Sequence, residues 1–337
     1  MKAISTAFLF FLALVSCGKD KSGPNNTLGA LTVNAVVATD NSGNVAFTAS
    51  AANATSYEYG FGNGVFQTVT SGVVNYRYPS GGNYTVTVTA RNAAGNSVTK
   101  TIDITVNVQL SLVWSDEFDT PGAPDPSKWN YDLGAGGWGN NELQYYTNRL
   151  ENASVSNGTL KIVAKAEAFS GANYTSARLL SKGKYSFKYG KLEFRAKLPA
   201  GGGTWPALWT LGDNISTVGW PACGEIDVME HVGNQLNKIY GTLHYPGRSG
   251  GSADGNTIMI SNATTAFHVY AVEWSPSSIK ISVDGTVYHT VTNSNSLPFN
   301  QNFFIIMNIA MGGNLGGTVD PAFSTGTMEV DYVRVYQ

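Results

Sequence analysis

Apolar and polar residues alternate along much of the chain, which is the pattern of strands with one buried face. YTVTVTARN (84–92) alternates, a turn follows, and VTKTIDITV (98–106) alternates again. Further along, KLEFRAKLP (191–199) has the same alternation, and IKISVDGTVYHTV (279–291) predicts a hairpin with Asp-Gly at its turn. MEVDYVRVYQ (328–337) closes the chain as a strand. No long amphipathic helical period is present, so the pattern predicts an all-β protein.

Two β units follow one another along the chain. Residues 28–107 carry short strands separated by turns, which predicts a small immunoglobulin-like β-sandwich. From residue 110 onward the strands are longer, and all seven tryptophans occur in this part of the chain. Residues 110–337 therefore predict a second domain, one large sandwich of two sheets.

The N-terminus has the features of an export signal. Lys2 is followed by an apolar run over residues 7–15, which is too short to span a membrane. The run ends in LVSC, which resembles a bacterial lipobox and implies cleavage after residue 16 and lipidation of Cys17. The alternative is an ordinary signal peptide with an incidental cysteine. Residues 17–27 predict a flexible tether, and the chain is expected to be an exported bacterial lipoprotein of the outer membrane or cell surface.

The composition narrows the range of partners. Charged residues make up 13% of the chain, against roughly 25% in an average protein. The formal charge is −2 and no basic cluster is visible, so no nucleic-acid partner is expected. The many aromatic rings suit the apolar face of a sugar. With Cys17 lipidated, Cys223 has no partner for a disulfide, and we expect it to be buried and inert.

The segment EIDVME places three acids, Glu225, Asp227 and Glu230, in an apolar strand of a charge-poor chain. Side chains alternate faces in a strand, so Glu225 and Asp227 share a face and Glu230 has the opposite parity. A β-bulge at Val228-Met229 would return Glu230 to that shared face. The alternatives are a solvated acidic edge or a Ca²⁺ site, but neither explains why the acids lie in so apolar a segment.

Spacing and charge then suggest the chemistry of the three acids. With one residue absorbed by the bulge, Glu225 and Glu230 lie ~13 Å apart between Cα atoms. Side chains leaning together could bring the carboxyl groups to the ~5–5.5 Å of a retaining glycosidase pair. Asp227 lies between them and could control protonation and orientation. Three acids so close cannot all ionise freely, so at least one pKa should rise, as a general acid requires.

The motifs around these acids, in chain order, resemble those of glycoside hydrolase family 16, in particular its bacterial laminarinase-like endo-β-1,3-glucanases. The resemblance covers roughly residues 111–337 and implies a β-jelly-roll with a long cleft and retention of configuration. The motifs are WSDEFD, WGNNELQYYT, YTSARL, GTWPALWTLG, WPACGEIDVMEHVG, GTLHY, FHVYAVEW, VDG, NIAMGG and VDYVRVYQ.

The first unit resembles the polycystic-kidney-disease (PKD) type of immunoglobulin-like domain through YEYGFGNG and YRYPSGGNYTVTVTARNAAGNS. Tyr59 and Asn63 stand where members of that family often carry Trp and Asp. The resemblance implies a domain that spaces or presents a catalytic domain. We assign Tyr57, Tyr59 and Phe61 to core packing rather than to glycan contact.

The family 16 resemblance implies a role for each matching residue. Glu225 would be the nucleophile, Glu230 the acid/base and Asp227 the assisting acid. The expected sugar platforms are Trp138, Trp205, Trp209 and Trp220. The expected hydrogen-bonding partners of sugar hydroxyls are Asn141, Glu142, Arg178 and His244. The alternative for each of these side chains is packing in the core.

The same resemblance predicts the substrate. β-1,3-Glucan (laminarin) leads, and mixed-linkage β-1,3-1,4-glucan is a second substrate. One alternative is a marine galactan such as agar, porphyran or carrageenan, whose sulfated forms need cations in the cleft, where few candidates besides Arg178 exist. Another is a glycan-binding protein without turnover. No cofactor is expected for catalysis, and the protein is expected to be a monomer.

Family relatives often hold one structural Ca²⁺ far from the cleft. The positions that match are Glu117, the carbonyl of Gly158, and Asp331, and oxygen ligands suit this ion. The alternative is that these are plain surface acids.

Overall fold

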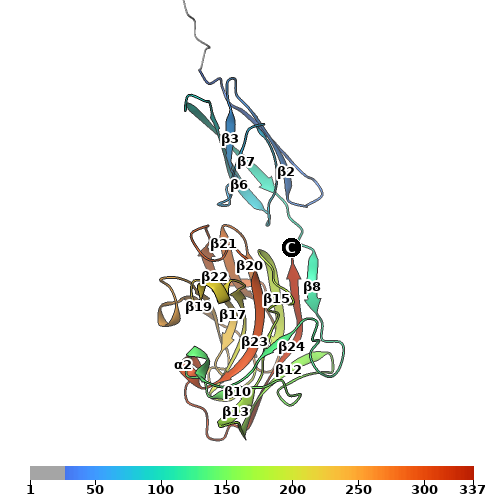
Figure 1. Ribbon diagram of the computed structural model, residues 1–337. Helices are drawn as coiled ribbons and strands as arrows, with labels where there is room; N and C mark the ends of the chain where they lie inside the picture. The colour runs from blue at the N-terminus through green and yellow to red at the C-terminus, as the bar shows by residue number, and fades with distance from the viewer. Residues whose placement is uncertain (1–26) are drawn as a thin grey trace, which may run out of the picture.

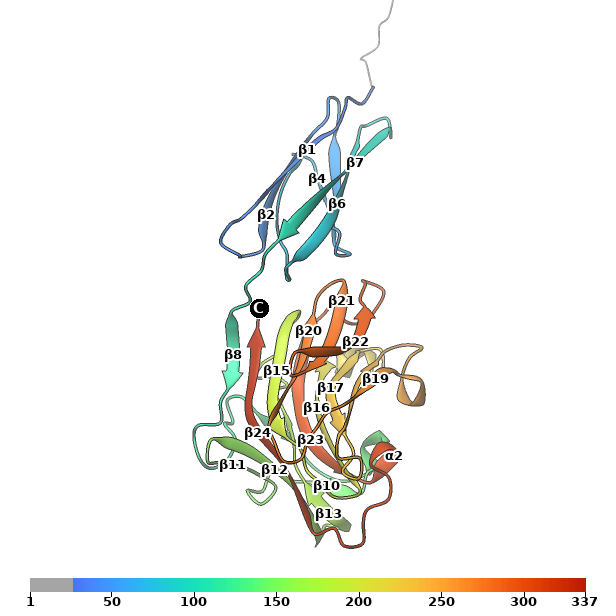
Figure 2. The ribbon, with the colours of Figure 1, turned by 180° about the vertical axis from the view of Figure 1, so that it is seen from behind.

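The computed structural model describes residues 27–337 and shows a nearly all-β chain, as predicted (Figure 1). The predicted signal peptide, Cys17 and all but the last residue of the tether lie outside the described residues. Within residues 27–337, no helix combines the length and apolarity needed to cross a membrane. Two β units are visible, joined by the short segment between β7 and β8 (Figure 2).

The N-terminal unit is a sandwich of two antiparallel sheets. The first sheet has the order β1 (Thr32–Val37), β2 (Asn44–Ser50), β5 (Val73–Arg77). The second has the order β4 (Phe66–Val69), β3 (Ser56–Gly60), β6 (Gly82–Arg91), β7 (Ser97–Val106). The two alternating segments of the sequence are β6 and β7. Tyr57, Tyr59 and Phe61 are buried in the core between the sheets, which confirms their assignment to packing.

The second unit is a larger sandwich. One sheet has the order β19 (Asp254–Met259), β18 (Lys238–His244), β17 (Glu225–His231), β16 (Thr204–Gly212), β23 (Phe303–Met311), β14 (Arg178–Leu180), β9 (Asn130–Asp132). The other has the order β10 (Gln144–Tyr146), β13 (Ala172–Ser176), β12 (Thr159–Phe169), β24 (Thr325–Tyr336), β15 (Gly190–Lys197), β20 (His268–Trp274), β21 (Ser278–Val283), β22 (Thr286–Thr292). Off this path, β11 (Ala153–Ser156) pairs with β12 and β8 (Leu112–Asp116) with β24. The helical elements are short: α1 (Ile215–Val218), α2 (Gly313–Gly316), and 3₁₀ turns over Gly137–Gly139 and Gly250–Ser252.

Alternation along the strands builds the core of this sandwich. In β15 every second side chain is buried, and Leu192 and Phe194 join one continuous apolar cluster with residues of the opposite sheet such as Ile226. The predicted hairpin is present: β21 and β22 are joined by Asp284 and Gly285, both with positive φ. Such values fit a two-residue primed turn, for which Asp-Gly is a preferred pair.

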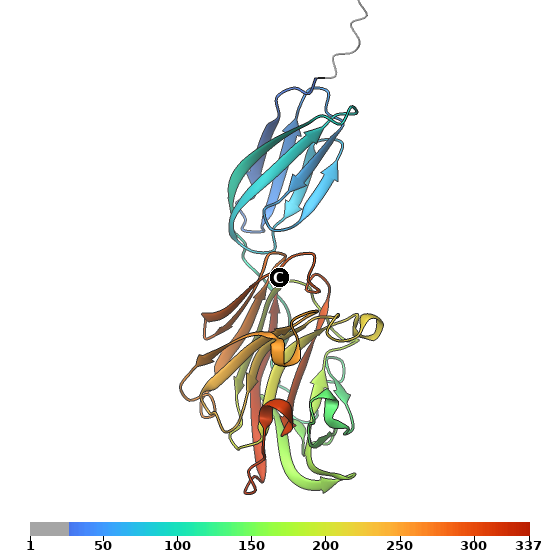
Figure 3. The ribbon, with the colours of Figure 1, turned by 90° about the vertical axis from the view of Figure 1, so that its left-hand side faces the viewer.

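The two units contact each other end to end. Figure 3 shows the small unit beyond one end of the large unit, next to the C-terminus. The Asn295 side-chain amide donates to the Gly64 carbonyl at 3.5 Å, and the backbone N–H of Gln109, in the segment that joins the units, donates to the Asn41 carbonyl at 2.8 Å. The seven-stranded sheet, which carries the three acids, is left free of this junction.

Candidate active site

The acidic strand β17 contains the predicted bulge. Asp227 pairs with Trp209 of β16, but Met229 pairs with the very next residue, Leu208, so Val228 is the extra residue. On the other side, Asp227 pairs with Thr242 and Glu230 with Tyr240, again with one residue more on β17. Ile226, Val228 and Met229 are buried in the core. The bulge therefore resets the alternation, and the prediction that Glu230 rejoins the face of Glu225 is confirmed.

Each glutamate of the triad receives an indole N–H. Trp205 Nε1 donates to Glu230 Oε1 at 3.0 Å, and Trp220 Nε1 donates to Glu225 Oε2 at 3.0 Å. Thr242 Oγ1 donates to the second oxygen of Glu230, Oε2, at 3.2 Å. Two of the predicted sugar platforms thus also hold the carboxyl groups in position.

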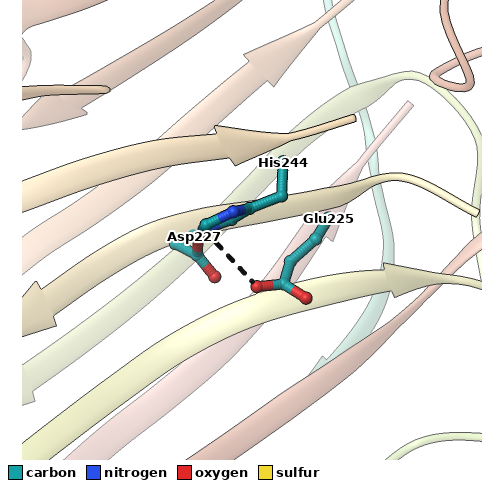
Figure 4. A group of neighbouring side chains, drawn as sticks. All are labelled: Glu225, Asp227 and His244. Atoms are coloured by element: carbon teal, nitrogen blue, oxygen red, sulfur yellow. Dashed lines mark ion pairs between the residues drawn. The ribbon is translucent and has the colours of Figure 1, made fainter. Parts of the chain in front are cut away.

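Asp227 lies beside His244 of the neighbouring strand (Figure 4). His244 Nε2 is 3.2 Å from Asp227 Oδ2 and 3.8 Å from Glu225 Oε1. The Gly250 backbone N–H donates to His244 Nδ1 at 3.1 Å. Because Nδ1 accepts, the proton of the neutral ring lies on Nε2 and points toward the carboxylates.

Burial dominates the electrostatics of the three acids. It raises the pKa of Glu225 from the ordinary 4.5 to about 8, with the charge of Asp227 adding to the effect. The pKa of Asp227 is raised well above its usual range by burial and by the charge of Glu230. Burial also raises the pKa of Glu230, opposed by the hydrogen bonds from Trp205 and Thr242. The three groups therefore hold fewer than three negative charges near neutral pH, as the spacing of the acids predicts.

This arrangement predicts that the site lowers the stability of the fold at high pH. The folded state holds the Glu225 proton up to a pKa of about 8, against 4.5 for the ordinary group. The stabilisation of the fold by protonated Glu225 is full below pH 4.5 and is lost as the pH rises through 8. Replacing Glu225 with glutamine is expected to raise the free energy of unfolding by about 1–2 kcal/mol at pH 8.5, or about 2–8 °C in Tm. The gain should shrink toward pH 4.5, and thermal unfolding of both proteins across this range measures it.

The matched control for this stability experiment is E273Q, since Glu273 is an exposed acid of the same domain on β20. Its Tm difference from the wild type should stay flat across the same pH range. An E225Q variant no more stable than wild type at pH 8.5, or equally stabilised at both ends of the range, would contradict the proposed burial of a proton.

A groove of about 600 Å³ crosses the face of the seven-stranded sheet above the acids. All predicted catalytic and sugar-contacting residues line it, with the exception of Asn141. The guanidinium of Arg178 lies 5.1 Å from the ring centre of Trp138 and 4.8 Å from that of Trp209. Arg178 Nε also pairs with Asp132 Oδ2 at 3.0 Å. Arg178 therefore stiffens two aromatic walls, in addition to any contact with sugar.

Two neighbouring residues differ from the expectation in how they are used. Asn141 adopts a positive φ of 60° in a turn and donates to Asn314 Oδ1 at 2.9 Å, while Asn140 takes the place in the groove lining. Glu142 lines the groove, but its oxygens already accept hydrogen bonds from Asn140, Gln144 and Tyr146. Its carboxylate therefore also orders this wall of the groove.

Several residues of the groove were not predicted from the sequence, among them Asn308 and Thr242, which contact predicted site residues. Asn308 is the one polar side chain of the buried strand β23 and accepts from Trp209 Nε1 at 2.8 Å. The single Asn in the apolar run FFIIMNIAM could have identified this groove residue from the sequence. Thr242 lies on the same face of β18 as His244, two residues away, so strand alternation would have found it.

Two of the three predicted calcium ligands, Glu117 and Asp331, are already engaged by arginine side chains. Both carboxylate oxygens of Glu117 accept from Arg334, at 3.0 and 2.8 Å, and this contact lowers the pKa of Glu117. Asp331 pairs with Arg195 at 2.5 Å, and Gly158 occupies a turn with φ 70°. A donor set already engaged by two arginines does not fit a cation, and calcium binding stays a prediction of the family resemblance.

In residues 27–337, one group of three acidic or imidazole side chains brings ligand atoms within 4.8 Å of one another, namely Glu225, Asp227 and His244. His244 turns an N–H rather than a lone pair toward the two acids, so this set does not fit a metal. Elsewhere, Cys223 is buried as predicted, and burial raises its thiol pKa to about 11, which keeps it unreactive.

Three carboxyl groups beneath an indole-lined groove on one face of a β-sandwich define a glycoside hydrolase. Comparisons with known proteins agree. The family model for glycosyl hydrolases family 16 matches residues 140–334, and the PKD domain model matches residues 30–106. The chain is 49% identical over 242 residues to the beta-glucanase of Rhodothermus marinus, covering 67% of this chain and 85% of that protein.

Two further relatives extend the comparison. The glucan endo-1,3-beta-glucosidase of Cryptopygus antarcticus is 41% identical over 248 residues, covering 66% of this chain and 90% of its own. The X-ray structure of the laminarinase from Rhodothermus marinus superposes with a TM-score of 0.66 at 48% identity, covering 68% of this chain and 98% of that one. The chain belongs to glycosyl hydrolases family 16, and a PKD domain precedes the family 16 domain in the sequence.

Proposed function

We propose that the protein is an endo-acting, retaining glycoside hydrolase that cleaves β-1,3-glucan of the laminarin type, with mixed-linkage β-1,3-1,4-glucan as a second substrate. The observation that carries the proposal is the bulged strand, which places Glu225, Asp227 and Glu230 in one aromatic groove. The names of the relatives, a beta-glucanase, a laminarinase and a glucan endo-1,3-beta-glucosidase, support the choice of polymer.

The reaction proceeds by double displacement. Glu225 attacks the anomeric carbon while Glu230 passes its proton to the glycosidic oxygen as that bond breaks. A water molecule then attacks the same carbon, gives its proton to Glu230, and releases Glu225. Attack requires Glu225 to be ionised. Asp227 can hold the proton that Glu225 gives up, because the pKa of Asp227 is raised well above its usual range. The Trp220 N–H stabilises the ionised oxygen of Glu225.

The groove chemistry favours an uncharged polymer. Of the residues that line it in the described part of the chain, Arg178 is the sole lysine or arginine, and Asp132 already pairs with it. A sulfated galactan would bring several negative charges into this groove without matching cations. A binding protein without turnover would have no need to bury three acids at the expense of stability.

We carry forward, as proposals, the predictions that the protein is a monomer and an exported lipoprotein held at the outer membrane or cell surface through Cys17. The lipobox resemblance of LVSC supports this anchor. The PKD domain would then space the catalytic domain from the membrane.

Product analysis on laminarin, mixed-linkage β-glucan and agarose tests the proposed function. Laminarin should release oligosaccharides of mixed length early in the reaction, because a groove that accepts the middle of a chain cuts at internal bonds. Products from agarose alone would keep the chemistry and overturn the polymer. A folded protein that releases nothing from any of the three would contradict the assignment as a β-glucanase.

A further inference from the structure

Glu230 is held by two donors of different kinds. The Trp205 indole N–H reaches Oε1 at 3.0 Å, and the Thr242 hydroxyl reaches Oε2 at 3.2 Å. An indole N–H can only donate, whereas a hydroxyl can donate or accept. Oε1 therefore remains an acceptor in every protonation state, and the acidic proton of Glu230 belongs on Oε2, beside Thr242.

From this geometry we propose that Thr242 is a positioning residue that holds the Glu230 proton on Oε2, the oxygen that delivers it to the leaving group. This inference rests on the proposed function and adds to it a residue and an atom. When Glu230 is protonated, before substrate binds, the direction of this hydrogen bond reverses and the Oε2 hydroxyl donates to Thr242 Oγ1. In the first step it moves to the glycosidic oxygen as the C–O bond breaks, and the Thr242 hydroxyl turns to donate to the Oε2 carboxylate. In the second step the water proton returns to Oε2.

The surroundings of Thr242 support this use of its hydroxyl. Thr242 pairs with Asp227 across β17 and β18, and the bulge brings Glu230 back to its side of the sheet. Within residues 27–337, the structure gives the Thr242 hydroxyl no hydrogen-bond partner besides Glu230. Its backbone belongs to the β18 ladder, so removing the hydroxyl leaves the strand pairing unchanged.

The hydroxyl also influences the ionisation of Glu230. A hydrogen bond to a charged carboxylate is stronger than one to a neutral acid, so Thr242 lowers the Glu230 pKa against the rise caused by burial. The other titratable groups that face Glu230 are Glu225 and Asp227 on its own strand, His244 and Tyr240 on β18, and Tyr288 on β22. None of these side chains is hydrogen-bonded to the Thr242 hydroxyl in the structure of residues 27–337.

The test compares T242V, which replaces the hydroxyl with a methyl group of similar size, with T242S, which keeps the hydroxyl. T290V is the control because Thr290 is exposed on β22. On laminarin, T242V should lower kcat roughly 5- to 50-fold, because it removes the charge-assisted hydrogen bond from the Thr242 hydroxyl to the Glu230 carboxylate. KM should change little. The alkaline limb of kcat/KM should move up by about half a pH unit, because the protonated form of Glu230 persists to higher pH. T242S and T290V should behave as wild type.

An activated substrate separates proton delivery from simple loss of structure. With a 2,4-dinitrophenyl β-laminaribioside the leaving group needs no proton, so kcat/KM of T242V should stay within about 3-fold of wild type. Equal losses on both substrates, or an unshifted alkaline limb, would overturn the role of Thr242. Should T242V fail to fold, T242A compared with T242S gives the same contrast. Wild-type activity on laminarin reports the proposed function, whereas the ratio of variant to wild type reports this inference.

Discussion

Replacing Glu225 with glutamine is expected to lower kcat on laminarin by roughly 10⁴-fold or more, because the amide cannot form the covalent glycosyl–enzyme bond. Binding should survive, since glutamine keeps the shape of the side chain and can still accept from the Trp220 N–H. Reducing-sugar release measures the first effect. Titration calorimetry with a laminarin oligosaccharide measures the second.

Chemical rescue tests whether Glu225 is the nucleophile or whether the site merely needs an acid at this position. In E225A, azide should attack an activated glycoside directly and give a glycosyl azide of inverted configuration, because no covalent intermediate forms first. E273Q serves as the surface control and should keep full activity. Turnover by E225Q close to the wild-type rate would exclude Glu225 as the nucleophile.

Replacing Glu230 with alanine is expected to lower kcat on laminarin about 10²- to 10⁴-fold, which is the usual contribution of general acid–base catalysis. The loss arises because the sugar leaving group is a poor one without a proton. With a dinitrophenyl leaving group, formation of the glycosyl–enzyme should be nearly normal and its hydrolysis slow, so the intermediate should accumulate. A burst of dinitrophenol followed by slow turnover is the signature to measure.

Azide also distinguishes the two glutamates from each other. In E230A it should attack the accumulated intermediate and give a glycosyl azide of retained configuration, opposite to the product expected from E225A. If E230A gave the inverted azide, the roles of Glu225 and Glu230 would have to be exchanged. An alanine variant with full activity on laminarin would show that another group supplies the proton.

The site illustrates why an enzyme gives up stability for activity. Asp227 is 3% exposed and Glu230 is 9% exposed, and both lie over an apolar core. Burial disfavours their charged forms, which keeps protons available for transfer near neutral pH but opposes folding once the acids ionise. In E225Q the same substitution removes both a buried ionisable group, which accounts for the expected stability gain, and the nucleophile, which accounts for the expected loss of activity.

Much of the local structure follows from the sequence because strand alternation has a fixed period of two. The pattern of KLEFRAKLP defines β15, the Asp-Gly pair predicts the turn before β22, and the parity of EIDVME requires a bulge for Glu230 to join Glu225. These inferences depend on neighbouring residues along the chain, and the geometry of a strand is enough to make them. The aromatic and hydrogen-bonding residues of the groove were inferred differently, from the resemblance to glycoside hydrolase family 16.

The tertiary structure alone decided which distant side chains meet. Arg178 lies between Trp138 and Trp209, three residues from separate parts of the chain. The turn at Asn141 directs Asn140 into the groove, and the arginines beside Glu117 and Asp331 occupy the oxygens that a cation would need. Thr242 contacts Glu230 because β17 and β18 pair in one particular register, which the bulge shifts by one residue. Such contacts depend on strand order, register and rotamer, and a one-residue change in register would replace all of them.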